Sequence, residues 1–296
     1  MIKRAFINKS QDKLENLIKS LLTVCEKVMG LGEIKNLKPN SYYNSLFKGE
    51  TCYILGNGPS LKNEKNLEKI AGKHVFTVNQ MFRSNIFNLV EPEFHVMCDF
   101  RFFELDALNK SENDTLLRMK NLKNTNNLKL ILPIKYKKYI EENEIGKTDT
   151  NIYIDGRYRM FKGYSKDIRL DDYLPGSLNV VLTAIYCAIG MGFSKIILLG
   201  CDMTGIMDNY IKKSNGDVER FSHIYSYTNE ERERMKKVHS SISNEDMLFS
   251  FAKMFSDFEA ISQYCKKKGI ILINATCETA LDCLEFGNLD ELLNER

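Results

Sequence analysis

The feature of this sequence that most restricts its fold is a series of short apolar segments separated by longer, helix-like stretches. The clearest of these segments is Ile196–Leu199, which is apolar at every position. Continuously apolar strands are typical of parallel sheets whose two faces are both covered by helices. The segments predicted to be strands are residues 51–55, 75–78, 94–98, 128–132, 151–154, 195–199 and 269–274.

The stretches between these strands predict helices over residues 61–71, 177–191 and 244–268. The chain has 296 residues, of which 43% are hydrophobic, and this is enough for one large core. No internal repeat or low-complexity linker divides it. We therefore predict one α/β domain over residues 49–296, with a Rossmann-like, mostly parallel sheet and a polar, irregular lid at about 204–242. Residues 1–48 should form an N-terminal helix and a connector.

Residues 11–30 show the periodicity of an amphipathic helix. Two partners for its apolar stripe stay open: protein, either this domain or a second subunit of a homo-oligomer, and the surface of a membrane. The acidic residues Asp12, Glu15 and Glu26 favour protein, because helices that lie on membranes are usually basic. The stripe consists of Leu14, Leu17, Ile18, Leu21, Leu22, Cys25 and Val28.

Several classes of protein are disfavoured by composition. The net charge is only +3 and the lysines are scattered, so no nucleic-acid partner is expected. The eight cysteines form no CxxC pair, which favours reduced thiols over disulfides or a zinc site. No apolar stretch reaches the roughly 20 residues needed to span a bilayer. The start of the chain also lacks a signal-peptide core. We expect a cytoplasmic protein, either free or at the cytoplasmic face of the inner membrane.

Polar residues follow nearly every predicted strand. In open parallel sheets, ligands bind beyond the carboxyl ends of the strands. These polar residues should therefore converge on one binding site, although polar strand ends are also ordinary loop chemistry. The residues predicted to bind a ligand here are Gly56, Asn57, Gly58, Ser60, Asn79, Gln80, Asp99, Asp202, Asn274 and Thr276.

The loop Gly56–Ser60 and the start of the helix at Ser177 are the two candidate anion sites. Glycines allow the backbone to approach a phosphate, and free N–H groups at a helix start face an anion. The loop is neither a Walker loop nor a complete dinucleotide fingerprint. Its structural alternative is a tight turn capped by Ser60, and for Gly176 and Ser177 the alternative is a simple helix N-cap.

Two of the four histidines lie in the predicted lid, where a general base is commonly placed. These are His223 and His239, and we favour His223. The other two, His74 and His95, lie in or beside strands and should be structural.

Five blocks of the sequence resemble the bacterial sialyltransferases of glycosyltransferase family 42: residues 53–61, 78–82, 175–177, 188–202 and 268–276. The same blocks resemble the related hydroxymethylpterin-diphosphokinase-like family, whose members include proteins of surface-polysaccharide and flagellin-glycosylation clusters. The similarity extends in order over roughly residues 50–290, with unmatched stretches between the blocks.

The resemblance implies a GT-A-variant domain that uses a CMP-activated nonulosonic acid as donor and a cell-surface glycan as acceptor. It places Asn57 and Asn79 at the donor phosphate and sugar, Ser177 near the donor carboxylate, and Asn274 near the nucleotide. It also implies a lid histidine as the base. His223 matches the Ser-His pair of that lid. Tyr227 stands where the sialyltransferases keep their catalytic histidine, so Tyr227 and His239 are further candidates.

Asp99 departs from the sialyltransferases, which have asparagine there, and agrees with the diphosphokinase-like branch. A carboxylate beside a phosphate is repulsive unless a cation such as Mg²⁺ or a lysine lies between them. Three functions stay open. The first is a cofactor-independent glycosyltransferase of polysaccharide or lipopolysaccharide synthesis. The second is a Mg²⁺-dependent diphosphokinase that uses Asp99 and Asp202. The third is a non-catalytic scaffold that keeps only the fold.

Overall fold

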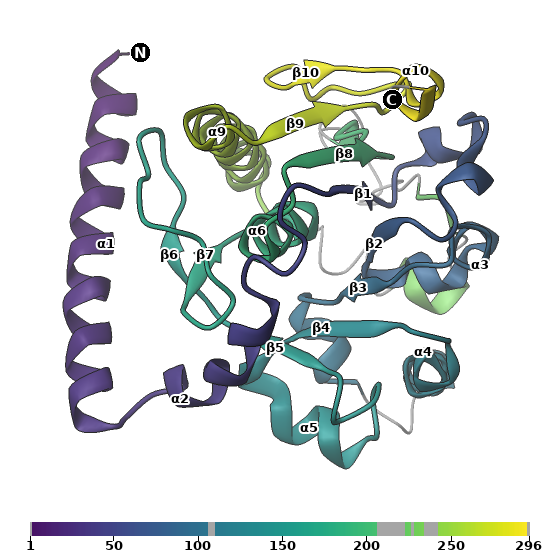
Figure 1. Ribbon diagram of the computed structural model, residues 1–296, viewed down its shortest axis with the longest axis horizontal. Coiled ribbons are helices and arrows are strands. Elements are labelled where there is room, and N and C mark those ends of the chain that lie inside the picture. The colour runs from purple at the N-terminus through teal and green to yellow at the C-terminus, as the bar shows by residue number, and fades with distance from the viewer. Residues whose placement is uncertain (1, 106–109, 206–222, 226–227, 234–241, 295–296) are drawn as a thin grey trace.

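The computed structural model describes residues 2–105, 110–205, 223–225, 228–233 and 242–294. Its main sheet has eight strands in the order β10-β9-β8-β1-β2-β3-β4-β5, and every paired neighbour is parallel (Figure 1). The strands are β1 Thr51–Leu55, β2 His74–Val78, β3 Phe94–Val96, β4 Lys129–Pro133, β5 Ile152–Ile154, β8 Lys195–Leu199, β9 Ile271–Asn274 and β10 Glu285–Phe286.

The sheet confirms the predicted Rossmann-like class. Each predicted strand is present, because continuously apolar segments bury both faces. The two-residue strand β10 was not predicted, since Glu285–Phe286 has no apolar run. The chain runs outward from β1 to β2, and β8 pairs on the other side of β1. The strand order therefore reverses between β1 and β8, and such a switch point is where α/β sheets bind ligands.

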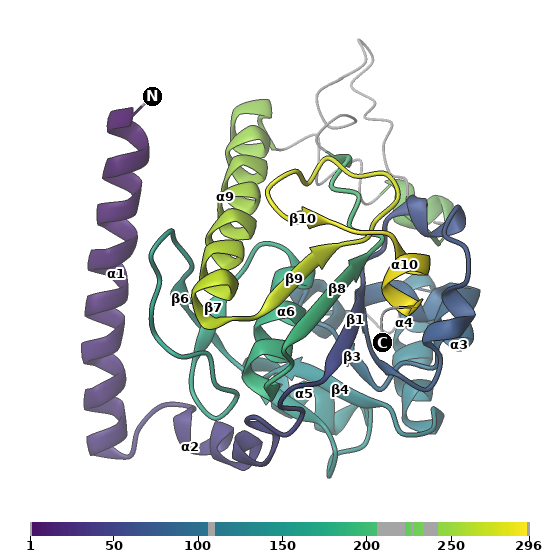
Figure 2. The ribbon, with the colours of Figure 1, turned by 45° about the horizontal axis from the view of Figure 1, so that its top comes forward.

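Helices cover both faces of the sheet. Figure 1 shows α6 and α9 on one face and α3 and α4 on the other, and Figure 2 shows the same arrangement from a second side. The central helix α6 is buried along nearly its whole length and touches β1, β2 and β3. The helix bounds are α1 Ile2–Met29, α2 Ile34–Leu37, α3 Asn85–Val90, α4 Lys110–Asn121, α5 Lys137–Glu142, α6 Val180–Met191, α9 Asn244–Lys268 and α10 Leu289–Asn294.

Two helix predictions need correction. The predicted helix over 61–71 is instead a pair of 3-10 turns, Pro59–Lys62 and Leu67–Ile70. Asn66 between them has a φ of 63°, which an α-helix does not allow. The helix predicted from Ser177 begins at Val180, because the side chain of Asn179 accepts the Val181 N–H and caps it.

A second, two-stranded parallel sheet lies between α1 and the main body (Figures 1 and 2). It consists of β6 Gly156–Arg159 and β7 Leu174–Gly176. The sequence did not predict it, because neither segment alternates or runs apolar. It forms the platform against which α1 lies.

The strand histidines behave as predicted. All eight cysteines are free thiols. His95 is buried between Phe82 and Phe87 and pairs with the Thr77 hydroxyl at 2.8 Å, and its burial lowers its pKa to about 3. His74 lies between two carboxylates, Glu50 and Glu93. In the part of the chain that the structure describes, no helix is both long and apolar enough to cross a membrane.

Candidate functional site

A cavity of about 310 Å³ opens at the carboxyl ends of β1, β2 and β8, at the switch point of the sheet. This volume lies at the lower end of the usual range for small-molecule sites, roughly 300–1,000 Å³. Residues after the three strands form its floor, the start of α6 forms one wall, and α9 and the segment at His223 close it. The described lining residues are Gly56, Asn57, Gly58, Pro59, Val78, Asn79, Asn179, Val180, Val181, Gly200, Cys201, Asp202, Met203, Thr204, Gly205, His223, Phe251, Met254 and Phe258.

The Gly56–Ser60 loop lines the cavity, but its main-chain amides are largely used within the protein. The Gly56 N–H donates to Leu199 O at 2.8 Å, and the Gly58 N–H donates to Gly200 O at 2.9 Å. The Ser60 N–H donates to Asp202 Oδ2 at 2.9 Å. Main-chain pairing thus continues past the ends of β1 and β8. Three of the loop's main-chain N–H groups are therefore engaged within the protein, and phosphate binding by this loop stays a prediction.

The glycines of this loop serve close packing against the residues that follow β8. A Cβ on Gly58 would lie 2.6 Å from the Gly200 carbonyl oxygen and closer still to the Asp202 carboxylate. A Cβ on Gly56 would collide with the same carbonyl. Both distances are far below van der Waals contact, so only glycine fits at these two positions. The loop forms one edge of the cavity.

Asp202 fixes that edge in place. Its carboxylate accepts the Ser60 N–H and also the Ser60 hydroxyl, and the side chain is only 5% exposed. Burial raises the pKa of Asp202 above its usual value, and the two bonds from Ser60 partly offset this effect. Ser60 is thus a partner of Asp202 and does not line the cavity. The predicted capping role of Ser60 is not observed, because its side chain caps no helix.

The raised pKa of Asp202 gives a testable pH dependence. Asp202→Asn should keep the structure, because a carboxamide can accept the Ser60 N–H and donate to the Ser60 hydroxyl. A carboxyl whose pKa is raised in the folded state contributes to the free energy of unfolding while it is protonated. This contribution is lost as the pH rises through that raised pKa. We expect the unfolding free energy of the wild type, minus that of Asp202→Asn, to fall as the pH rises above the ordinary carboxyl pKa of about 4. Urea unfolding of both proteins measures it, and a rising difference would refute the burial argument.

The electropositive element of the cavity is the start of α6. Val180 and Val181, its first two residues, line the cavity, and the aligned peptide dipoles of a 12-residue helix favour an anion at this end. The cap residue Asn179 is itself held by Ser177, whose hydroxyl donates to Asn179 O at 2.8 Å and accepts the Asn179 N–H at 2.9 Å. Ser177 therefore positions the cap and does not line the cavity. Gly176 lies in β7 against Gly156, also outside the lining.

Asn57 and Asn79 present the buried acceptors of the site. Both side chains line the cavity, and the Oδ1 atom of each is buried without a hydrogen-bond partner. The orientation of Asn57 is fixed, because its Nδ2 donates to Val78 O at 3.1 Å. Asn79 has a φ of 46°, a conformation that asparagine tolerates better than most residues. Buried acceptors without partners are costly, so both atoms are suited to receive donors from a ligand.

His223 lines the cavity on the lid side, where a hydrogen bond of 3.0 Å from Ile224 N to Asn57 O ties the segment to the β1 loop. Burial lowers the pKa of His223 to about 4, so its imidazole is neutral at pH 7. Its ring stacks on Tyr225 with centroids 5.2 Å apart. Of the other predicted catalytic residues, Tyr227 and His239 lie outside the described residues.

Behind His223 lies an ion pair that the sequence did not indicate. Arg83 packs over the Tyr225 ring at 5.3 Å and pairs with Glu231 at 2.6 Å. Glu231 is 4% exposed and also accepts the Thr228 N–H at 2.8 Å. Gln80, predicted to bind ligand, instead accepts a hydrogen bond from Arg83 at 2.7 Å. Nothing in the sequence links Arg83 to a residue 148 positions away.

Three more predicted residues lie outside the cavity lining. Asn274 and Thr276 are buried beneath it: Thr276 Oγ1 accepts the Cys201 N–H at 2.9 Å, and Asn274 Oδ1 accepts the Thr276 N–H at 3.2 Å. They hold the ends of β8 and β9 together. Asp99 is paired with the guanidinium of Arg101, whose Nε lies 2.9 Å from Asp99 Oδ1. It is not a lining residue.

The predicted magnesium ligands do not fit that role. A carboxylate-bound Mg²⁺ needs oxygens that are free and point at a shared position. Asp202 uses both of its oxygens on Ser60, and Asp99 uses both of its oxygens on Arg101. Over the described ranges, no group of three or more His, Cys, Asp or Glu side chains could hold a metal ion.

The apolar wall of the cavity comes from α9. Phe251, Met254 and Phe258 line it, and Phe258 is fully buried. These residues, like Asn179, were not predicted as site residues. In the sequence they have the spacing of ordinary core positions on a long helix, so only the sheet order reveals that this helix passes the switch point.

An open parallel sheet with a cavity at its switch point, beside a helix start, defines a doubly wound α/β protein. The family model of the 6-hydroxymethylpterin diphosphokinase MptE-like proteins matches residues 28–206, and the chain belongs to this family. This confirms the family resemblance predicted from the sequence. A comparison with curated proteins gave no significant match.

Solved sialyltransferase structures are similar to the chain at low sequence identity. The chain is similar to sialyltransferase CstII from Campylobacter jejuni in complex with the substrate analogue cytidine-5'-monophosphate, with 15% identity, a TM-score of 0.42, and coverage of 81% of this chain and 85% of that one. It is also similar to sialyltransferase CST-II in complex with a trisaccharide acceptor and CMP, with 16% identity, a TM-score of 0.45, and coverage of 83% and 88%.

Proposed function

We propose that the cavity binds a nucleotide-activated sugar of the CMP type, and that the chain transfers this sugar to a hydroxyl of a cell-surface glycan. The proposal rests on two features that occur together at the cavity: the start of α6, and the buried Oδ1 acceptors of Asn57 and Asn79. The helix start suits a phosphate, and the two Oδ1 atoms suit the hydroxyl and amino donors of a nucleoside or sugar. The sequence blocks shared with the sialyltransferases support the same assignment.

The charge of the lining favours a single phosphate over a chain of them. Among the described lining residues there is no lysine or arginine, and Asp202 is the one carboxylate. A di- or triphosphate concentrates several negative charges that proteins usually neutralise with cationic side chains or Mg²⁺. A CMP-sugar has one phosphate, and one helix start can stabilise its charge as it leaves.

The proposed reaction is a single displacement step. His223, neutral at pH 7, takes the proton of the acceptor hydroxyl. The acceptor oxygen then forms a bond to the anomeric carbon while the bond from that carbon to the phosphate oxygen breaks. The phosphate keeps the electron pair and leaves as CMP, with its added charge at the start of α6. The step inverts the configuration of the anomeric carbon.

The second candidate is diphosphoryl transfer from ATP to a small alcohol, which the name of the family supports. This reaction depends on Mg²⁺ between the phosphates. One observation speaks against diphosphoryl transfer: the carboxylate of Asp99 is bonded to Arg101, and that of Asp202 is bonded to Ser60.

A nucleotide screen separates the two candidates. CMP, CDP, UDP and ATP are each added with and without Mg²⁺, and the melting temperature is recorded. We expect CMP to raise it without Mg²⁺, since a ligand at 100 times its Kd adds about 2.7 kcal/mol of stability. A rise in melting temperature that requires Mg²⁺ and occurs with ATP but with none of the other nucleotides would favour the diphosphokinase. No rise with any nucleotide would contradict both candidates.

Asn57→Ala tests the role of the buried acceptors. The substitution removes Oδ1 from the cavity and should weaken CMP binding about 10-fold, the loss of one hydrogen bond to a ligand. Calorimetric titration measures the Kd, and thermal unfolding without ligand checks the fold. The matched control is Asn124→Ala, an exposed asparagine outside the cavity lining, for which the Kd should be unchanged. Equal Kd values for both variants would remove Asn57 from the site.

A further inference from the structure

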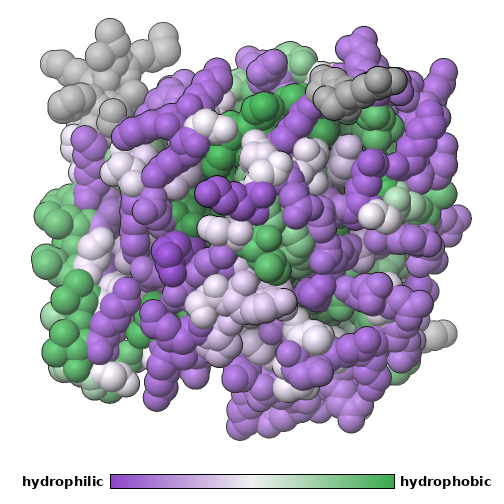
Figure 3. Space-filling view, viewed as in Figure 1, coloured by the Kyte–Doolittle hydropathy of each residue, from purple (hydrophilic) through white to green (hydrophobic). Residues whose placement is uncertain are grey.

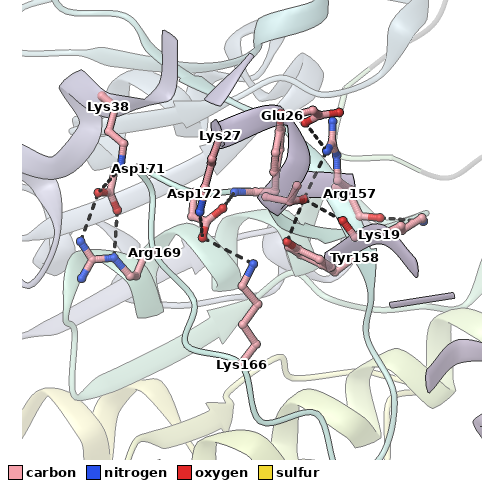
Figure 4. A network of polar contacts seen from close by, with 12 residues as sticks. Lys19, Glu26, Lys27, Lys38, Arg157, Tyr158, Lys166, Arg169, Asp171 and Asp172 are labelled. Carbon is pink, nitrogen blue, oxygen red and sulfur yellow. Dashed lines mark hydrogen bonds and ion pairs between the residues drawn. The ribbon is translucent and has the colours of Figure 1, made fainter. Parts of the chain in front are cut away.

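Helix α1 faces the protein with its polar side. Figure 4 shows the contacts: Glu26 pairs with Arg157 at 2.6 Å, and Lys19 donates to the Arg157 carbonyl at 2.7 Å. Lys27 reaches Asp172 at 3.3 Å. The carboxamide of Asn16 also bonds the Arg159 backbone in both directions, at 2.8 and 2.6 Å. These bonds to the platform of β6 and β7 fix the rotation of the helix about its axis.

The apolar side of α1 therefore faces outward. Figure 3 shows hydrophobic residues gathered along the edge of the molecule where α1 lies in Figure 1. An amphipathic helix normally buries its apolar stripe against its own domain, and here the orientation is reversed. We call these residues the α1 stripe: Leu14, Leu17, Ile18, Leu21, Leu22, Val24, Val28, Met29 and Leu31, each between 50% and 82% exposed.

The α1 stripe is a large exposed apolar surface. Each of its nine residues is at least half exposed, and exposed apolar patches larger than a few hundred Å² usually mark an interaction site. The stripe therefore marks such a site.

The spacing within the stripe indicates that its partner is another helix. Four stripe residues, Leu14, Ile18, Leu21 and Val28, and the exposed Cys25 beside them are separated alternately by four and three residues. This spacing is the heptad seam along which two helices pack knobs into holes. The residues on either side of the seam are apolar as well, which broadens the contact. In the described ranges of this chain, no other helix covers the seam, and an identical seam is present on every other copy.

Charge argues against a lipid surface as the partner. In the part of α1 that carries the stripe, residues 10–29, three lysines at 13, 19 and 27 balance three acids at 12, 15 and 26, and the other basic residues of the helix, at 3, 4 and 9, precede the stripe. Lys19 and Lys27 are engaged with the platform. Helices that bind anionic membranes usually have a cationic polar face exposed beside the apolar one. From the orientation, spacing and charge of α1, we propose that two copies of the chain associate by packing their α1 stripes against each other.

The test is the oligomeric state of the full chain. Sedimentation equilibrium should give the wild type at least twice the mass of one chain. The double variant Leu21→Glu with Val28→Glu should be a monomer, its dissociation constant raised about 100-fold or more by two charges in the seam. Both side chains are exposed in one copy, at 60% and 82%, so the circular dichroism spectrum should not change. The matched control is Leu89→Glu, an exposed leucine on α3 that should leave the mass unchanged.

Three results would overturn the proposal. One is a monomeric wild type at about 100 µM, far above the Kd expected for a stable interface. Another is a double variant that stays associated. The third is a monomeric wild type that floats with vesicles of phosphatidylglycerol and phosphatidylethanolamine, which would assign the stripe to a membrane instead.

Discussion

Gly58→Ala is expected to lower the free energy of unfolding by about 3 kcal/mol or more, the upper range for overpacking a tight contact. The added methyl group would overlap the Gly200 carbonyl and the Asp202 carboxylate. The carbonyl belongs to the main chain and the carboxylate is buried, so neither can move freely. The backbone itself is compatible with alanine, since Gly58 has φ −65° and ψ 142°. The whole loss would therefore be steric. Urea unfolding followed by circular dichroism measures it.

The control for this prediction is Gly72→Ala. Gly72 has a φ of 75°, and nothing lies within 4 Å of a Cβ placed there. Alanine should cost about 1 kcal/mol at this position, from backbone strain alone. If Gly58→Ala is no less stable than Gly72→Ala, the close packing between the β1 loop and the β8 loop is not as described.

His223→Gln is expected to lower the turnover number about 100-fold or more, the usual effect of losing a general base. The Kd for CMP should stay within about 3-fold, because the base acts on the acceptor rather than on the nucleotide. Release of CMP from a CMP-activated sugar in the presence of acceptor measures the rate. Burial lowers the pKa of His223 to about 4, and the neutral form is the active one. Wild-type kcat/KM should therefore hold from pH 7 down to about pH 5 and fall only as the pH approaches 4.

The control for the base is His239→Gln. His239 was the other lid histidine considered from the sequence, and its replacement should leave turnover within about 3-fold of the wild type. A large loss in His239→Gln together with an active His223→Gln would move the base to His239. A wild-type rate that falls near pH 6.5 would also contradict the buried environment of His223.

The parallel sheet could be predicted because its strands are apolar at nearly every position, a pattern that leaves few alternatives. The switch point was not predicted, because it depends on the order of the strands in the sheet. The segment 61–71 could not be predicted correctly, because its helix-like apolar spacing is interrupted by the left-handed conformation of Asn66. The strands β6 and β7 were missed because short polar strands have no periodic signal.

For the candidate site, the sequence indicated the strand ends but not how each polar group is used. Asn57 and Asn79 were predicted and line the cavity. Ser60 and Asp202 were predicted as ligand contacts, yet they satisfy each other across 142 positions of sequence. Single residues give no sign of such pairing. The proposed function places the anion at the start of α6, because three amides of the β1 loop are bonded within the protein.

The helix α1 shows a limit of periodicity arguments. The apolar stripe was predicted correctly as a helix face, but a pattern does not say which way that face points. The direction depends on Glu26, Lys19 and Asn16, whose partners on β6 lie more than 130 positions away. Only the folded arrangement shows that the polar face is the one used internally.

A crystal structure of the protein grown with CMP tests the central claim most directly. The account predicts the phosphate at the start of α6, beside Val180 and Val181, with Asn57 Oδ1 or Asn79 Oδ1 accepting a hydrogen bond from the nucleoside. An empty cavity at saturating CMP, or CMP bound away from the carboxyl ends of β1, β2 and β8, would contradict it.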